Sequence, residues 1–175
     1  MAKIRFHATN EYLEGSDKVR DFLSPLGVTY EVWGVDRLPE NLRENYQLTD
    51  EEKSHIIEHF RKEIDEISTR RGYTTADLVM LSENTPNLDK LLVAFRGEHH
   101  HTDDEVRFCV DGHGIFTINA GDNWFDVEMD PGDLISVPSY TRHYFSLQDD
   151  RKIKAIRLFV TPAGWEAIYE KQTSA

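Results

Sequence analysis

Cysteine is almost absent from this sequence, since Cys109 is the single cysteine among 175 residues. One thiol cannot form a disulfide within the chain, and it cannot build a zinc site that needs several thiolate ligands. The sequence is therefore expected to belong to a reducing compartment.

Positive charge is also scarce. The chain has 20 Lys and Arg residues against 32 Asp and Glu residues, which gives a formal net charge of −12. A chain this acidic, without a run of basic residues, is a poor match for the phosphates of nucleic acids or for anionic membranes. We expect neither nucleic acid nor membrane as a partner.

Long apolar runs are missing as well. The opening stretch MAKIRFHATNEYLEG lacks the apolar core of a secretory signal, and no later stretch is long and uncharged enough to span a membrane. The sequence therefore predicts a soluble, cytoplasmic protein. A hydrophobic fraction of 39% is ordinary for a globular chain and is enough for the core of a single domain over residues 1–175.

The first 73 residues carry both strand and helix signals. Residues 3–8 (KIRFHA) and 29–35 (TYEVWGV) are rich in β-forming residues and predict strands, with a short helix between them from about Ser16.

The clearest helix is predicted from Thr49 to about Arg71. Thr49 and Glu52 match the capping box, and apolar residues recur at helical spacing behind them. Gly72 is expected to end this helix in a left-handed conformation. A structural role is the simplest interpretation of this segment.

From residue 74 to residue 166 the chain consists mainly of short β-rich runs. They are TADLVMLSE, EVRFCV, GIFTINA, WFDVEM, LISVP, HYFSL and IKAIRLFVT, separated by turn-forming clusters such as VDGHG and DPGD. NTPNLDKLL predicts one short helix. Many short strands at this spacing indicate an antiparallel barrel or jelly roll. We therefore predict a mainly β fold, with the N-terminal strands and helices packing on the barrel and residues 167–175 forming a tail.

The most informative stretch is GEHHHTDDEVRFCVDG, residues 97–112. Alternate residues of an extended strand share a face, so His99, His101 and Glu105 point to one side if TDD introduces no bulge. Neutral imidazoles and a carboxylate together suit Fe(II), Ni, Mn, Co or Zn. Taken alone, the pattern is also compatible with a polar surface cluster.

A second segment supplies a fourth candidate ligand. Gly132, Pro138 and His143 form G-x5-P-x4-H, in which a turn at DPGD and a strand at LISVP can carry His143 to a position facing the first cluster. Together the two segments resemble the two motifs of the cupin superfamily. The matching positions are His99, His101, Glu105 and Gly112 in the first motif, and Gly132, Pro138 and His143 in the second.

Some positions depart from the cupin pattern. Tyr140 stands where the second motif has glycine, Leu147 stands where it has asparagine, and the glycine before the first histidine is absent. These changes affect turn geometry more than ligation. The resemblance implies a cupin double-stranded β-helix, a jelly-roll barrel, with all four ligand positions intact.

The resemblance then narrows to one family. EHHHTDDEVRFCVDGHGIF is similar to the EHxHxDDEVRFxVxGxGxF signature of acireductone dioxygenases, and similarity continues in RGYTTADLVMLS, WFDV, DPGDLISVP, RHYF, AIRLF and GWEA. It covers most of residues 70–166. Tyr144 stands where this family usually has tryptophan, and Cys109 stands where an aromatic residue is common.

This resemblance implies a metal-dependent dioxygenase of methionine salvage, and the family suggests a monomer. His99, His101, Glu105 and His143 would hold one Fe(II) or Ni(II) per monomer, and O2 would cleave 1,2-dihydroxy-5-(methylthio)pent-1-en-3-one, an acireductone. With Fe(II) the implied products are formate and 4-methylthio-2-oxobutanoate. With Ni(II) they are formate, carbon monoxide and 3-methylthiopropanoate.

Charge counting adds a role for Arg107. A divalent metal and the Glu105 carboxylate leave one positive charge, and a substrate dianion turns this into one negative charge. Arg107 shares the strand face of the ligands, so we expect it to donate to the substrate, and we predict Arg107 and Glu105 as catalytic residues. The alternative for Arg107 is a salt bridge with an acid such as Asp104.

Other residues near the motifs have simpler interpretations. Glu98 and Asp104 are candidates to orient the ligand imidazoles, His100 is expected to point away, and His113 is expected to be solvated in a turn. Surface pairing or barrel core is the simplest interpretation of the remaining arginines and aromatics, of which one or two can line a pocket for the methylthio group. These are Arg96, Arg142, Arg157, Phe95, Phe108, Trp124, Phe125 and Phe145.

Two other functions stay open on the sequence. One is a different cupin enzyme, such as another enol-cleaving dioxygenase or a sugar isomerase. The other is a non-enzymatic binding or storage cupin, although such proteins often lose ligands that are intact here. The sequence does not distinguish iron from nickel, because both accept the same ligands.

Overall fold

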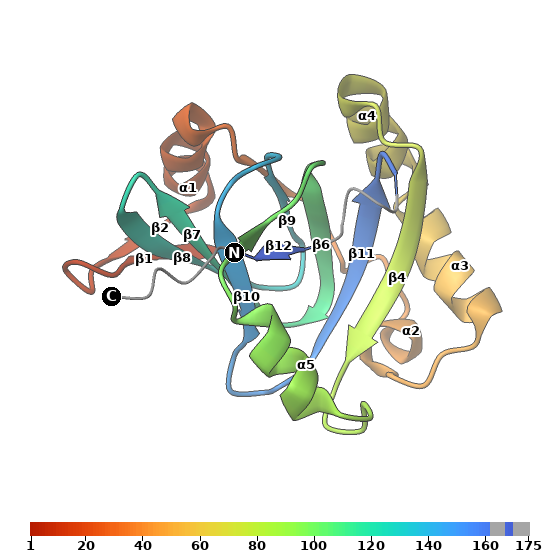
Figure 1. Ribbon diagram of the computed structural model, residues 1–175. Coiled ribbons are helices and arrows are strands. Elements are labelled where there is room, and N and C mark those ends of the chain that lie inside the picture. Colours follow the sequence, from red (N-terminus) through yellow and green to blue (C-terminus); the bar gives the residue numbers. More distant parts are fainter. Residues whose placement is uncertain (162–166, 170–175) are drawn as a thin grey trace.

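The computed structural model describes residues 1–161 and 167–169, which form two antiparallel sheets on either side of a barrel interior (Figure 1). Sheet A has the strand order β12 (Ile168–Tyr169), β5 (His99–His100), β10 (His143–Leu147), β7 (Gly114–Ala120), β8 (Asn123–Met129), β1 (Lys3–Phe6) and β2 (Tyr12–Glu14). Sheet B has the order β3 (Thr29–Val32), β9 (Asp133–Val137), β6 (Glu105–Gly112), β11 (Ile153–Phe159) and β4 (Thr75–Leu81). This architecture confirms the prediction of a mainly β, cupin-like fold.

The N-terminal segment contributes strands to both sheets. In sheet A, β1 pairs with β8, and Ile4 lies opposite Val127. In sheet B, β3 pairs with β9, and Tyr30 lies opposite Ile135. The two strands predicted near the N-terminus are therefore present, and they extend the sheets that carry the site.

Strand β6 shows how alternating side chains separate two cores. Phe108 and its outward-facing neighbours pack with the helices, whereas Arg107 and Cys109 alternate with them and point into the barrel. All three of these side chains are buried. Burial on both faces agrees with the four apolar residues of the run EVRFCV, and its two charged residues, Glu105 and Arg107, face the barrel interior.

Three helices cover the outer face of sheet B (Figure 1). They are α2 (Glu40–Glu44), α3 (Asp50–His59) and α4 (Arg61–Arg71). The others are α1 (Ser16–Leu23), followed by the 3-10 turn η1 (Ser24–Leu26), and α5 (Leu88–Phe95), which confirms the helix predicted in NTPNLDKLL.

The predicted capping box begins α3. Thr49 Oγ1 accepts from the Glu52 amide at 3.2 Å, and Glu52 Oε1 accepts from the Thr49 amide at 3.0 Å. Such a cap is worth about 1 kcal/mol. Gly72 ends α4 with φ of 79°, as predicted.

The prediction of one continuous helix from Thr49 to Arg71 is wrong, because the chain turns at Phe60. Phe60 has φ of −109° and ψ of 14°, so it ends α3 and precedes α4. Its ring is fully buried, with centroids 4.7 Å from Phe108 and 6.4 Å from Trp33. Two short helices follow the curved outer face of the sheet, and helical periodicity alone does not reveal this break.

No helix within the described ranges is long and apolar enough to cross a membrane. Most of the GWEA motif and most of the predicted tail, residues 167–175, lie outside the described residues.

Candidate metal centre

The first ligand segment crosses from one sheet to the other. Strand β5 ends at His100 in sheet A, residues 101–104 form a bend, and β6 begins at Glu105 in sheet B. The condition that TDD introduces no bulge is therefore not met, because residues 101–104 leave the strand. His99 and Glu105 still converge, because the two sheets face the same interior.

His143 completes the group from a neighbouring strand, as the second motif predicts. It is the direct cross-strand partner of His99, and the two ring centroids are 4.7 Å apart. One ligand atom from each of His99, His101, Glu105 and His143 lies within 4.8 Å of all the others. All four side chains are buried.

Backbone carbonyls orient two of the imidazoles. His99 Nδ1 lies 2.6 Å from the Gly97 oxygen, and His143 Nδ1 lies 2.7 Å from the Thr141 oxygen. Each carbonyl accepts a hydrogen bond from Nδ1–H, which leaves the Nε2 lone pair for a cation.

The predicted acids do not orient these two imidazoles. Glu98 pairs with Arg142 at 2.6 Å, and Asp104 accepts hydrogen bonds from Tyr73 and Ser139. This expectation is corrected, because a carbonyl two residues before each histidine is already within reach.

Glu105 lies at the centre of the group. Its Oε2 is 2.6 Å from His143 Nε2 and 2.9 Å from His101 Nε2. Burial by itself raises the pKa of Glu105, but the charges of His143 and Arg107 and the hydrogen bonds of the two histidines hold that pKa well below its usual value. The side chain is therefore an anionic ligand at physiological pH.

The pKa values of His99 and His143 shift in opposite directions. Burial lowers the pKa of His99, which favours the neutral form that binds metals. Burial also acts to lower the pKa of His143, but the Glu105 carboxylate outweighs it and raises that pKa. The arrangement can hold a cation that replaces the protons shared among these groups.

Arg107 pairs with the carboxylate of Glu105, whereas the hydrogen bonds of Asp104 go to Tyr73 and Ser139. Its Nε donates to Glu105 Oε1 at 2.9 Å, and its guanidinium carbon lies 4.7 Å from the centroid of the Phe145 ring. Arg107 thus brings a buried positive charge to the wall of the site.

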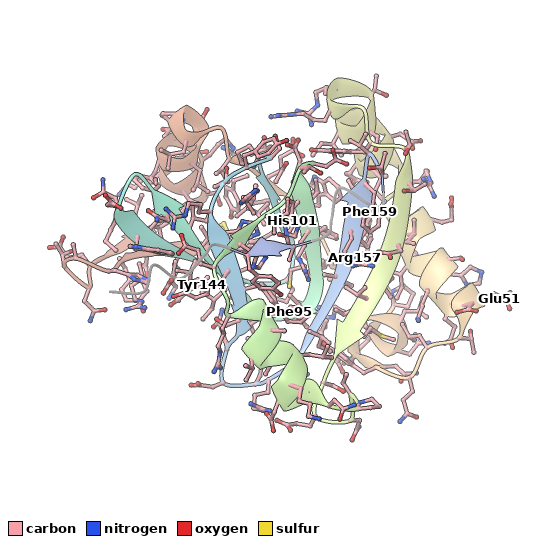
Figure 2. All side chains as sticks on the ribbon, in the orientation of Figure 1. Glu51, Phe95, His101, Tyr144, Arg157 and Phe159 are labelled. Atoms are coloured by element: carbon pink, nitrogen blue, oxygen red, sulfur yellow. The ribbon has the colours of Figure 1, made fainter. Side chains whose placement is uncertain are left out.

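A cavity of about 230 Å³ opens beside the four-residue group, and three of its members, His99, His101 and Glu105, line it. Its wall includes Val79, Leu81, Phe95, His99, His101, Glu105, Arg107, Phe145, Arg157, Ala167 and Tyr169. Figure 2 shows Phe95, His101 and Arg157 around this interior. Strand periodicity could not single out Val79, Leu81 or Tyr169, because their placement depends on which strands become neighbours.

The remaining candidates lie elsewhere. Phe108 and Phe125 belong to the two cores, as expected, and Trp124 lines a separate hollow. His100 is half-buried beside the Tyr140 ring. His113 is not simply solvated, because its Nδ1 lies 2.7 Å from Asp150 Oδ2.

Comparison with known proteins identifies close relatives. The sequence matches the ARD/ARD' family over residues 4–167. It is 58% identical to an acireductone dioxygenase of Bacillus thuringiensis subsp. konkukian, over 97% of this chain and 100% of the relative. A solved structure described as "Acireductone dioxygenase from Bacillus anthracis with cadmium ion in active center" has a TM-score of 0.93 and 58% identity, and the match covers 97% of this chain and 98% of that chain.

Proposed function

The chain belongs to the ARD/ARD' family, and from the convergence of three imidazoles and one carboxylate we propose a metal-dependent acireductone dioxygenase. It is an oxidoreductase. The reaction is oxidative cleavage of 1,2-dihydroxy-5-(methylthio)pent-1-en-3-one by O2 in methionine salvage. The single observation that carries this proposal is the spacing of the four ligand atoms, all within 4.8 Å of one another.

The donor set fits a divalent transition metal. Three neutral imidazoles and one carboxylate suit borderline metals such as Fe(II) and Ni(II), and the Bacillus anthracis relative holds a cadmium ion in its active centre. We assign His99, His101, Glu105 and His143 as ligands of one Fe(II) or Ni(II) per chain. The metal then determines the products: formate and 4-methylthio-2-oxobutanoate with Fe(II), or formate, carbon monoxide and 3-methylthiopropanoate with Ni(II).

The metal, when bound, supplies Lewis-acid chemistry that favours the deprotonated enediol. The chain fixes the direction of its ligands before this happens. Gly97 and Thr141 hold the Nδ1 sides of His99 and His143, so neither ring needs to reorient. Burial of all four ligands excludes competing water from their side of the site.

Arg107 orients the Glu105 carboxylate and also supplies positive charge to the cavity. The Nε hydrogen bond from Arg107 fixes Glu105 Oε1 and directs Oε2 towards His101 and His143. Because Arg107 also lines the cavity, its positive charge balances the anionic form of the substrate there. We therefore assign both as catalytic residues.

Apolar side chains form the part of the wall that suits a thioether. Val79, Leu81, Phe95 and Phe145 line the same cavity as the ligands. A methylthio group is apolar and polarizable, and contacts between sulfur and aromatic rings are favourable. We propose that this wall receives the substrate tail.

The chain is proposed to act as a monomeric cytoplasmic enzyme with O2 as its second substrate. The family resemblance supports the monomer, and the single cysteine agrees with a reducing compartment.

Anaerobic metal loading followed by O2 uptake tests this function. The metal-free protein is loaded with Fe(II) or Ni(II), synthetic acireductone is added, and O2 consumption and products are measured. We expect turnover that depends on metal and a product set that changes with the metal. Metal-independent O2 uptake, or turnover only of another enolate or of a sugar phosphate, would contradict the assignment.

A further inference from the structure

The two segments that carry the ligands are tied together outside the strands. The Tyr140 amide donates to the His101 carbonyl at 2.8 Å, and the Ser139 amide donates to Asp104 Oδ1 at 3.2 Å. Residues 101–104 and 138–142 belong to no strand in this structure. These hydrogen bonds therefore influence the spacing between His101 and His143 where no sheet ladder fixes it.

The second carboxylate oxygen of Asp104, which does not bind Ser139, is held by Tyr73. This oxygen, Oδ2, accepts from the Tyr73 hydroxyl at 3.0 Å, and that hydroxyl lies 3.1 Å from Ser136 Oγ. Both Tyr73 and Ser136 are buried. Burial raises the pKa of Tyr73 to about 12, so the phenol keeps its proton and remains a donor.

We propose that Asp104 is a positioning residue that holds the His101–Glu105 segment against the segment that leads to His143. The inference rests on the proposed function, in which these residues are the metal ligands. An ionised carboxylate offers two acceptor oxygens and no donor, which matches the two donors that face it. Asp104 acts through its hydrogen bonds to Tyr73 and Ser139, which together are called the bracket below. It does not line the cavity that receives substrate.

Asp103 provides a matched control. It carries the same charge in the same bend, and its Oδ2 accepts from both the amide and the hydroxyl of Thr161, at 3.3 and 2.9 Å. Thr161 follows β11 and is not part of either ligand segment. Asp103→Ala therefore removes comparable hydrogen bonds without releasing the bracket.

Asp104→Asn separates a hydrogen-bond role from a charge role. The amide oxygen can still accept from Ser139, and the amide nitrogen can donate to the Tyr73 oxygen. The Tyr73 hydroxyl then has to donate to Ser136 Oγ, which lies at 3.1 Å. The bracket survives this change without its negative charge, whereas Asp104→Ala destroys it.

The experiment compares the wild type with Asp104→Ala, Asp104→Asn and Asp103→Ala. The dissociation constant for Ni²⁺ is measured with metal-free protein, kcat and KM are measured with metal at saturation, and unfolding of the metal-free protein is followed in urea. For Asp104→Ala we expect metal affinity weaker by about 10- to 100-fold. We also expect a lower kcat with little change in KM, because the cavity wall is intact. Asp104→Asn and Asp103→Ala should stay close to wild type.

Wild-type Ni²⁺ affinity in Asp104→Ala overturns the proposal, even if that variant is less stable, because a merely structural role lowers stability without changing the folded site. Equal damage in Asp104→Asn and Asp104→Ala also overturns it. If Asp104→Ala does not fold, Tyr73→Phe carries the test: weaker Ni²⁺ binding supports the bracket, and wild-type binding contradicts it. Failure of the wild type to turn over acireductone would defeat the proposed function alone, since the affinity comparison is independent of turnover.

Discussion

Arg107 and Glu105, two residues apart on β6, share a buried hydrogen bond of 2.9 Å between Nε and Oε1. Strand alternation places both side chains in the barrel interior, so the arginine supports a ligand and lines the cavity at once. The acid that pairs with Arg107 is thus Glu105, whereas the sequence suggested Asp104 as an example, and substrate contact stays a proposal. In the proposed contact with substrate, the donors are the guanidinium N–H groups other than Nε–H, which binds Glu105.

Replacing Arg107 tests its catalytic role. We expect Arg107→Ala to lower kcat/KM by about 10²- to 10³-fold, the usual cost of losing a donor to developing negative charge. Arg107→Lys should recover part of this loss, because it keeps the charge but not the planar fork. Steady-state kinetics on metal-loaded variants, with metal content measured in parallel, check the prediction. Wild-type kcat/KM in Arg107→Ala would rule out the assigned role.

Metal occupancy should fall as the pH falls. Imidazoles bind metals only when deprotonated, so protons compete with the cation below the ordinary histidine pKa of about 6.5. Burial acts to lower the pKa of His143, but the carboxylate of Glu105 outweighs it and raises that pKa. Burial lowers the pKa of His99, so His143 is protonated before His99. Metal content after dialysis at a series of pH values measures the effect. Occupancy unchanged down to about pH 4 would contradict histidine ligation.

Lys154 is a buried cation whose removal should destabilise the fold. Its Nζ donates to the carbonyls of Leu42, Arg43 and Asn45 at 2.6–2.7 Å, at the C-terminal end of α2. Lys154→Met fills a similar volume but leaves these carbonyls without a donor, so we expect a loss of about 2–4 kcal/mol in the free energy of unfolding. Urea unfolding measures it, with Lys152→Met as the control because Lys152 is 43% exposed.

The effect of Lys154 should also depend on pH. Burial lowers its pKa to about 8 from a usual 10.5. Between these values the unfolded chain binds the proton and the folded chain does not, so the stability from this group rises as the pH increases from about 8 to about 10.5. The difference between wild type and Lys154→Met should therefore widen across this window. A constant difference would show that the amine does not titrate there.

Tyr140, which stands where the second cupin motif has glycine, has a left-handed backbone conformation. Its φ is 64°, which is unfavourable for a residue with a Cβ. Since alanine keeps this strain and glycine does not, Tyr140→Gly should be more stable than Tyr140→Ala by about 1 kcal/mol. Thermal unfolding of the two variants makes the comparison. An alanine variant as stable as the glycine variant would show that the turn relaxes without strain.

Local patterns predicted most of the elements. The capping pair Thr49–Glu52 located the start of α3, and the alternation of EVRFCV predicted β6 and the placement of Arg107 inside the barrel. The break at Phe60 could not be predicted, because it depends on the ring packing against Trp33 and Phe108, which are distant in sequence.

The convergence of the four side chains was predicted correctly, but partly for the wrong reason. Strand parity placed His99 and Glu105 on one face, whereas the chain actually changes sheets between them. The orienting carbonyls of Gly97 and Thr141 leave no signal in side-chain chemistry. The anchoring of Asp104 by Tyr73 joins residues 31 positions apart, which only the folded structure brings together.

The metal content of purified wild type, His143→Ala and His100→Ala tests the central claim most directly. His143 is the one ligand from the second segment, and His100 is a neighbouring histidine outside the group. We predict about one transition-metal ion per chain in the wild type and in His100→Ala, and loss of both metal and activity in His143→Ala. Stoichiometric metal retained by His143→Ala would show that the four side chains do not share one cation.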